Sequence, residues 1–128
     1  MPIYYIDANY FLRFILKDNF SQWKIANNYF EKAKQEKIRL VFLTEVLMEI
    51  EYVMRKVYKF ERKLIFKYIS TLLVINSFEI TDREILKMAL LTYLNKNIDF
   101  VDGIIFYKAK NRQAEVLSFD KDFDKINM

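Results

Sequence analysis

Short apolar runs alternate with longer amphipathic stretches, and this alternation constrains the fold more than any other feature of the chain. Two short runs have the β-branched and aromatic composition of buried strands, namely Ile3–Ile6 and Arg39–Leu43. Glu115–Phe119 reads as a last strand, and Phe78–Ile80 as a short one. Strands that are separated by helices form a largely parallel sheet. The sequence therefore predicts an α/β fold.

The helices are predicted from apolar residues that recur with helical spacing. The clearest case is Thr44–Tyr58, where Thr44 is the expected cap. Thr81 and Glu84 have the spacing of a capping box and predict the start of another helix. Further helices are expected after Asp7, over residues 21–37 and 60–73, and from about Asp99. At 128 residues, with no repeat or linker, residues 1–128 are expected to form a single domain.

Two absent residue types exclude several kinds of enzyme. The chain has no Cys, so we expect neither disulfides nor a Cys₂His₂-type zinc site. It also has no His, which excludes Ser-His-Asp triads and nucleases that use His as acid and base. Catalysis would have to use carboxylates, Lys, Tyr, Ser, Thr or a metal. Oxygen ligands alone suit hard cations such as Mg²⁺ or Mn²⁺.

Charge and hydropathy bound the partners. The formal net charge of +4 is compatible with an anionic partner such as nucleic acid. No export signal is visible at the N-terminus, and no run of about 20 apolar residues exists that could cross a membrane. We therefore expect a cytoplasmic protein without a membrane partner.

Acidic residues stand at the ends of predicted strands and at one helix start. Asp7 follows the first strand, Asp120 follows the last strand, and Asp99 and Asp102 lie three residues apart at a helix start. In open α/β sheets ligands bind beyond the carboxyl ends of the strands, so these acids are expected to meet in one crevice. Such a cluster can hold one or two divalent ions for phosphodiester cleavage.

Each acid also has an ordinary structural interpretation. Asp7 and Asp99 could cap helices, and Asp102 could sit at the third helical position, where the helix dipole favours an acid. Asp120 could be a turn residue. Only the joint pattern favours a functional site.

A fourth acid is expected from the Thr44–Tyr58 helix. Glu49 lies on the edge of its apolar stripe, Glu45 lies one turn away on the same flank, and Glu51 lies on the opposite edge. Helical geometry favours Glu49 or Glu45 for a half-buried role and does not decide between them. A solvated Glu remains the alternative for all three.

Four segments in order resemble the PIN-domain family, and within it the VapC-type toxins of toxin–antitoxin pairs. These segments are "YYIDANYFLRFIL", "LMEIEYVMRKVYKFER", "IDFVDGIIFYKAK" and "VLSFDKDFDKI". Each motif is weak alone, but together they span nearly the whole chain. The last segment departs from the family because its acid is followed by Lys121 and Asp122. The resemblance implies a three-layer α/β/α sandwich with a central, mainly parallel sheet.

The resemblance also implies a function and a set of site residues. It implies an endoribonuclease that holds Mg²⁺ or Mn²⁺, acts on RNA, is often a homodimer and is silenced by a cognate antitoxin protein. It selects Glu49 over Glu45. By position, the catalytic residues would be Asp7, Glu49, Asp99 and Asp102, the metal ligands Asp7, Asp99, Asp102 and Asp120, and the supporting polar residues Asn9 and Ser118.

Two other functions compete with this interpretation. A non-catalytic module that binds nucleic acid or protein would keep the same fold without turnover. Aspartyl-phosphate chemistry ranks last, because Asp7-Ala8-Asn9 lacks the second Asp that phosphatase-like domains carry two residues on.

Overall fold

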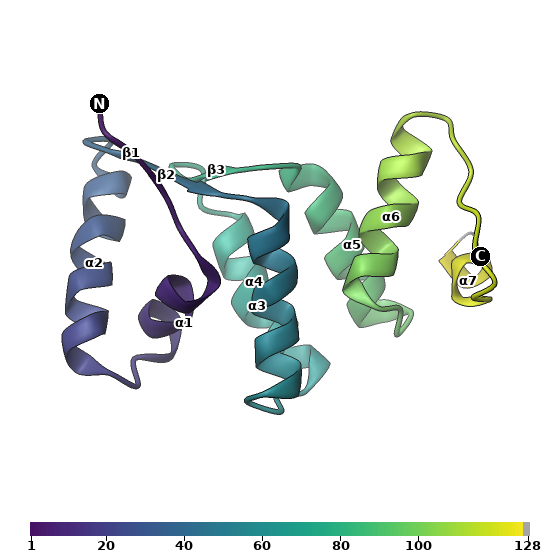
Figure 1. Ribbon diagram of the computed structural model, residues 1–128, viewed down its shortest axis with the longest axis horizontal. Coiled ribbons are helices and arrows are strands. Elements are labelled where there is room, and N and C mark those ends of the chain that lie inside the picture. Colours follow the sequence, from purple (N-terminus) through teal and green to yellow (C-terminus); the bar gives the residue numbers. More distant parts are fainter. Residues whose placement is uncertain (127–128) are drawn as a thin grey trace.

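The structure is a computed structural model that describes residues 1–126. In Figure 1 the strands run along the top of the molecule, α1 to α4 descend beneath them, and α5 to α7 continue to one side. The elements in chain order are β1 (Ile3–Tyr5), α1 (Ala8–Leu16), α2 (Phe20–Lys34), β2 (Arg39–Phe42), α3 (Thr44–Lys56), α4 (Arg62–Leu73), β3 (Glu79–Ile80), α5 (Arg83–Asn95), α6 (Phe100–Asn111) and α7 (Asp122–Ile126).

The sheet has the order β1-β2-β3, and both pairings are parallel. In register, Ile3 lies opposite Arg39 and Val41 lies opposite Glu79. The α/β prediction and the parallel sheet are confirmed. β2 is central and buried, as expected, but the expected burial of β1 is wrong because all three of its residues are exposed. β1 is exposed because it is an edge strand with one neighbour.

Two predicted helix caps are wrong, and the same contacts explain both. The backbone N–H of Thr81 donates to the Phe42 carbonyl, so Thr81 extends the sheet and Asp82 becomes the N-cap of α5. Thr44 lies inside α3, after the N-cap residue Leu43. Its hydroxyl donates to the Thr81 carbonyl at 3.2 Å and lies 3.3 Å from Oδ2 of Asp82. Thr44 therefore joins α3 to the start of α5.

The predicted last strand is also wrong. Residues 115–118 have no regular secondary structure, and Leu117 and Phe119 are 97 % and 107 % exposed. After α6 the chain turns at Gln113, which has a positive φ of 57°. It then lies at the opposite end of the long axis of the molecule from β1 (Figure 1). A strand needs a neighbouring edge to pair with, and this segment has none in the described part of the chain.

One apolar core supports the site. Phe30, Phe42 and Phe78 stack between α2 and the sheet, with ring centroids 5.3–6.3 Å apart. On the far side, α6 packs closely on α5, where an added Cβ at Gly103 would lie 3.2 Å from the Cα of Ala89. The one Gly of the chain therefore allows these helices to approach each other and fixes the start of α6.

Candidate metal centre

Three carboxylates meet where α6 and α7 approach each other. Oxygens of Asp102, Asp120 and Asp122 all lie within 4.8 Å of one another. Asp102 and Asp122 are half-buried, whereas Asp120 is exposed. We call these three residues the α6–α7 carboxylate group. Of the predicted ligands, Asp102 and Asp120 are brought together although 17 residues separate them.

Local backbone geometry positions the group. Asp102 lies in the first turn of α6, where its charge is favoured by the free backbone N–H groups of the helix start. The Asp120 N–H donates to the Ser118 hydroxyl at 2.9 Å, and the Asp122 N–H donates to Oδ1 of Asp120 at 2.9 Å. These bonds form a tight turn that aims Asp120 and Asp122 toward α6. Asp120 is thus a turn residue and a member of the group at once.

The group concentrates negative charge. Burial raises the pKa of the Asp102 carboxyl, and the charges of Asp99, Asp120 and Asp122 raise this pKa further. Within the group, Oδ1 of Asp122 forms an ion pair with Nζ of Lys125 at 2.9 Å. Three clustered carboxylate oxygens match the ligands that Mg²⁺ and Mn²⁺ prefer. The donor set therefore fits a hard divalent cation, which would relieve the repulsion.

Asp99 lies beside the group and is held from another helix. It is the N-cap residue of α6, but its side chain makes no cap hydrogen bond. Oδ1 of Asp99 lies 3.3 Å from Arg62, which also donates to the carbonyls of Tyr93 and Ile98. The Asp99 side chain remains 70 % exposed. Arg62 therefore joins α4 to the start of α6 and keeps Asp99 near the group.

Glu51 is a buried acid that the sequence did not single out. Oε2 of Glu51 accepts from Nε of Arg55 at 2.7 Å and from the Tyr93 hydroxyl at 2.9 Å. Burial and the hydrogen bond to Glu51 raise the pKa of Tyr93. The hydrogen bond to Glu51 raises the pKa of Arg55 too, and the charge of Asp99 contributes. A chain of polar contacts thus runs from α3 through α5 to the candidate centre.

The predicted half-burial of Glu49 or Glu45 is wrong, because both residues are exposed. Glu51, on the other edge of the stripe, is the buried acid of α3. Helical periodicity locates the apolar stripe but does not say which elements cover its two edges. In the structure α3 contacts α1, α4 and α6, so the edge that carries Glu51 is covered as well. The role that the resemblance gives to Glu49 stays a prediction.

Asp7 caps helix α1, which was the ordinary structural interpretation of this residue. Its side chain accepts from the Tyr10 N–H at 2.8 Å at the start of α1. Asp7 and the exposed Asn9 line a small hollow together with Arg13, Gln22 and Ala26. Within residues 1–126, Asp7 and Glu49 are not part of the α6–α7 carboxylate group. Their predicted convergence with Asp102 stays a prediction.

Asp122 is the member of the group that the sequence missed. It appeared only as a departure from the family pattern, yet in "SFDKDF" it stands two residues after Asp120. An Asp-x-Asp pair in a turn can present both carboxylates to one ligand. That spacing was the signal that could have identified Asp122.

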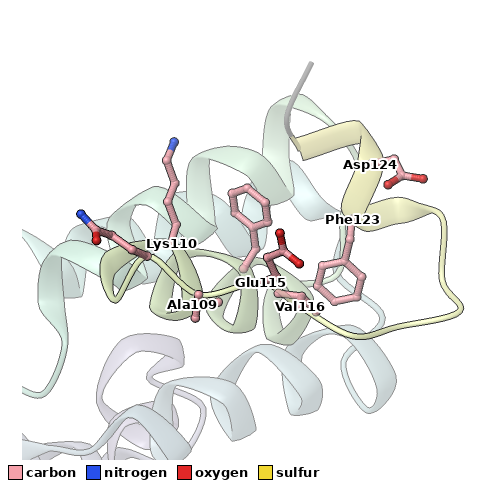
Figure 2. A pocket seen from close by; sticks show the side chains of 9 residues that line it. Ala109, Lys110, Glu115, Val116, Phe123 and Asp124 are labelled. Atoms are coloured by element: carbon pink, nitrogen blue, oxygen red, sulfur yellow. The ribbon is translucent and has the colours of Figure 1, made fainter.

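A hollow lies next to the group, between α6 and the segment that returns along it. Figure 2 shows Val116 and Phe123 lining this hollow, with Ala109 and Lys110 of α6 and the acids Glu115 and Asp124. Val116 is half-buried here, whereas its neighbour Leu117 faces solvent. Residues 115–116 thus run alongside α6 before the turn at Asp120.

Comparison with known families identifies the fold. The family model described as the PIN domain matches residues 4–127, nearly the whole chain. The chain belongs to the PIN-domain family. A relative named VapC ribonuclease, from Aquifex aeolicus (strain VF5), is 29 % identical over 99 residues, which cover 77 % of this chain and 73 % of the relative. No solved structure matches the chain significantly. Among the described residues of this PIN domain, no helix has the length and apolar character needed to cross a membrane.

Proposed function

We propose that this chain is a metal-dependent endoribonuclease and the toxin of a type II toxin–antitoxin pair. Membership of the PIN-domain family and similarity to a relative named VapC ribonuclease support the nuclease activity. The observation that carries the proposal is the α6–α7 carboxylate group in a chain that has no His or Cys. The proposal covers residues 1–128 as one nuclease domain that acts in the cytoplasm.

Asp102, Asp120 and Asp122 would hold Mg²⁺ or Mn²⁺, with Asp99 as a further ligand beside them. When bound, such an ion activates water and neutralises charge on the phosphate that is attacked. The protein's part is to position and orient the carboxylates. The Ser118 hydroxyl fixes the turn at Asp120, and Arg62 keeps Asp99 at the start of α6.

Asp7, Glu49 and Asn9 complete the proposed site by resemblance. Asp7 and Asn9 follow β1, and Glu49 lies on the solvent side of α3. We propose that Asp7 is a ligand and a catalytic residue, that Glu49 is catalytic, and that Asn9 supports Asp7. RNA as substrate, a cognate antitoxin and a homodimer are proposed on the same basis, together with the net charge of +4.

A non-catalytic binding module is the second candidate. Two observations favour it: the Asp7 side chain is used as a helix cap, and Asp99 is paired with Arg62. In that case the fold would bind nucleic acid or protein without cutting it.

Cleavage of labelled RNA separates the two candidates. The wild type should cut RNA with Mg²⁺ or Mn²⁺ and lose this activity in EDTA. Asp102→Asn and Asp7→Asn should each lose most of it. Asp124→Asn is the matched control, since Asp124 is exposed and outside the group, and it should cut like the wild type. Equal cleavage by Asp102→Asn and wild type, or undiminished cleavage in EDTA, would contradict the proposal. RNA binding without cleavage would favour the binding module.

A further inference from the structure

Positive charge is concentrated in one short part of the chain. Residues 55–67, which run from the end of α3 into α4, contain six cations and one acid, Glu61. Their formal net charge of +5 exceeds the +4 of the whole chain, so the remaining residues together are slightly acidic. Because the excess of positive charge belongs to this one segment, it draws an anionic partner to the α3–α4 turn rather than to the protein as a whole.

The lysines of the α3–α4 turn are exposed and have no acidic partner. This holds within residues 1–126 for Lys56, Lys59 and Lys63, none of which forms an ion pair. Their neighbours Arg55 and Arg62 are each paired with an acid. The three lysines are therefore available to an anion from outside the chain.

The turn that carries these lysines is tied down by backbone bonds and ring contacts. The N–H groups of Tyr58 and Phe60 donate to the carbonyls of Val53 and Met54 at 3.1 and 2.9 Å. The rings of Tyr58 and Phe60 are stacked, with centroids 5.6 Å apart. Lys59 stands between them in the chain and has a positive φ of 57°. The backbone is thus in place before a ligand arrives, which lowers the cost of ordering it on binding.

An exposed face of α3 leads to the same turn. Three exposed residues are three and four positions apart and so lie on one face of the helix: Glu49, Tyr52 and Lys56. Tyr52 is 54 % exposed, and the guanidinium of Arg55 lies 5.7 Å from the centroid of its ring. An acid, an aromatic ring and a cation therefore follow one another along this face toward the turn.

The turn also adjoins the candidate metal centre. Arg62, at the start of α4, lies 3.3 Å from Oδ1 of Asp99 and donates to the Ile98 carbonyl at 2.9 Å. In Figure 1 the end of α3 and the start of α6 both lie on the side of the molecule away from the strands. A polymer held at the start of α6 therefore has the α3–α4 turn beside it.

We propose that one surface beside the candidate centre binds single-stranded RNA: Tyr52, Lys56, Lys59 and Lys63. We call it the α3–α4 basic surface, and the proposal rests on the proposed function. The lysine ammonium groups bind phosphates, and the exposed ring of Tyr52 stacks on a base. A single strand offers base faces to such a ring, whereas a duplex keeps them stacked inside. The surface holds the nucleotides on one side of the cleaved bond.

Binding of RNA in EDTA tests this surface separately from cleavage. The probe is a fluorescent single-stranded RNA of about 12 nucleotides, and its anisotropy is followed at several salt concentrations. The test variant is Lys56→Gln/Lys59→Gln/Lys63→Gln. The matched control removes the same charge at exposed positions of α2 and the turn after it, as Lys24→Gln/Lys34→Gln/Lys37→Gln. Circular dichroism shows that both variants are folded.

The test variant should bind RNA at least about tenfold more weakly than the wild type at about 0.1 M salt. Its slope of log affinity against log salt should be smaller by about 2, because each phosphate contact to a single strand contributes about 0.7. The control variant should stay within about threefold of the wild type and keep its slope. Equal affinities of the test and control variants, or no binding by the wild type, would overturn the proposal.

Two changes of Tyr52 test the stacking contact. Tyr52→Phe keeps the ring and should bind like the wild type, whereas Tyr52→Leu should bind at least about fivefold more weakly with an unchanged salt slope. Equal binding of Tyr52→Leu and the wild type, or equal binding of a duplex of the same length, would overturn recognition of a single strand.

The cleavage assay tells failure of this surface from failure of the proposed function. A wild type that binds RNA through the three lysines but does not cut it would support the surface and contradict the nuclease. A test variant that binds and cuts RNA like the wild type would overturn the surface and leave the nuclease standing.

Discussion

Replacing Tyr93 by Phe should measure what holds Glu51 inside the protein. The change removes one hydroxyl and keeps the ring, which lies 4.2 Å from the guanidinium of Arg62 and packs edge-to-face on Phe100. Oε2 of Glu51 loses the 2.9 Å bond from Tyr93 but keeps the 2.7 Å bond from Arg55. The carboxylate therefore stays paired, and the cost is that of one hydrogen bond to a charged group.

A hydrogen bond to a charged group contributes about 1.5–3 kcal/mol, and the remaining Arg55 bond puts the expected loss at about 1.5–2 kcal/mol. Urea unfolding followed by circular dichroism measures it. With a slope of about 1.5–2 kcal/mol per molar urea, the midpoint should fall by about 1 M. Tyr52→Phe is the matched control on the exposed face of α3 and should change stability by less than about 0.5 kcal/mol.

A double-mutant cycle shows whether Glu51 is the partner that matters. Glu51→Leu removes the acceptor, so adding Tyr93→Phe to that variant should cost close to nothing. If Tyr93→Phe is as harmful in the Glu51→Leu background as in the wild type, the loss comes from packing. The account of the buried carboxylate would then be refuted.

Two further predictions concern Asp102 and the close packing at Gly103. Without divalent ions, Asp102→Asn should stabilise the fold near neutral pH, because the pKa of Asp102 is raised on folding. In urea titrations at pH values below the ordinary pKa of 3.8, where Asp102 is protonated in both the folded and the unfolded state, this gain should vanish. A constant gain at all pH values would contradict this cause. Gly103→Ala should lower the free energy of unfolding in the same assay by about 1 kcal/mol, since crowding against the Ala89 backbone outweighs the better helix propensity of Ala. Any gain in stability would contradict the close packing of α6 on α5.

The sequence was sufficient for the elements whose partners are local. β2 follows from its apolar run, α1 to α6 from apolar periodicity, and the parallel order from helices between strands, whereas α7 was not predicted. Composition also predicts a strand at Glu115–Phe119, but composition cannot say whether an edge is within reach. In the structure that segment follows α6 and stays unpaired. Pairing between distant segments depends on how the intervening helices pack, and no local pattern contains that information.

The candidate centre was predictable in part for the same reason. Asp102 and Asp120 were expected to meet because both stand at element ends, and they do meet. Asp122 needed the geometry of the turn that begins at Ser118. Glu51 needed knowledge that α3 is covered on more than one side, so that Tyr93 of α5 reaches it. Helical periodicity ranks the faces of one helix, but it does not count the neighbours that cover them.

Calorimetric titration with Mn²⁺ tests the central claim most directly. The wild type and Asp124→Asn should bind the ion with equal affinity, whereas Asp102→Asn should bind at least about tenfold more weakly because it loses one ligand and one negative charge. Equal binding by all three proteins, or no binding to the wild type, would contradict a metal centre built on Asp102, Asp120 and Asp122.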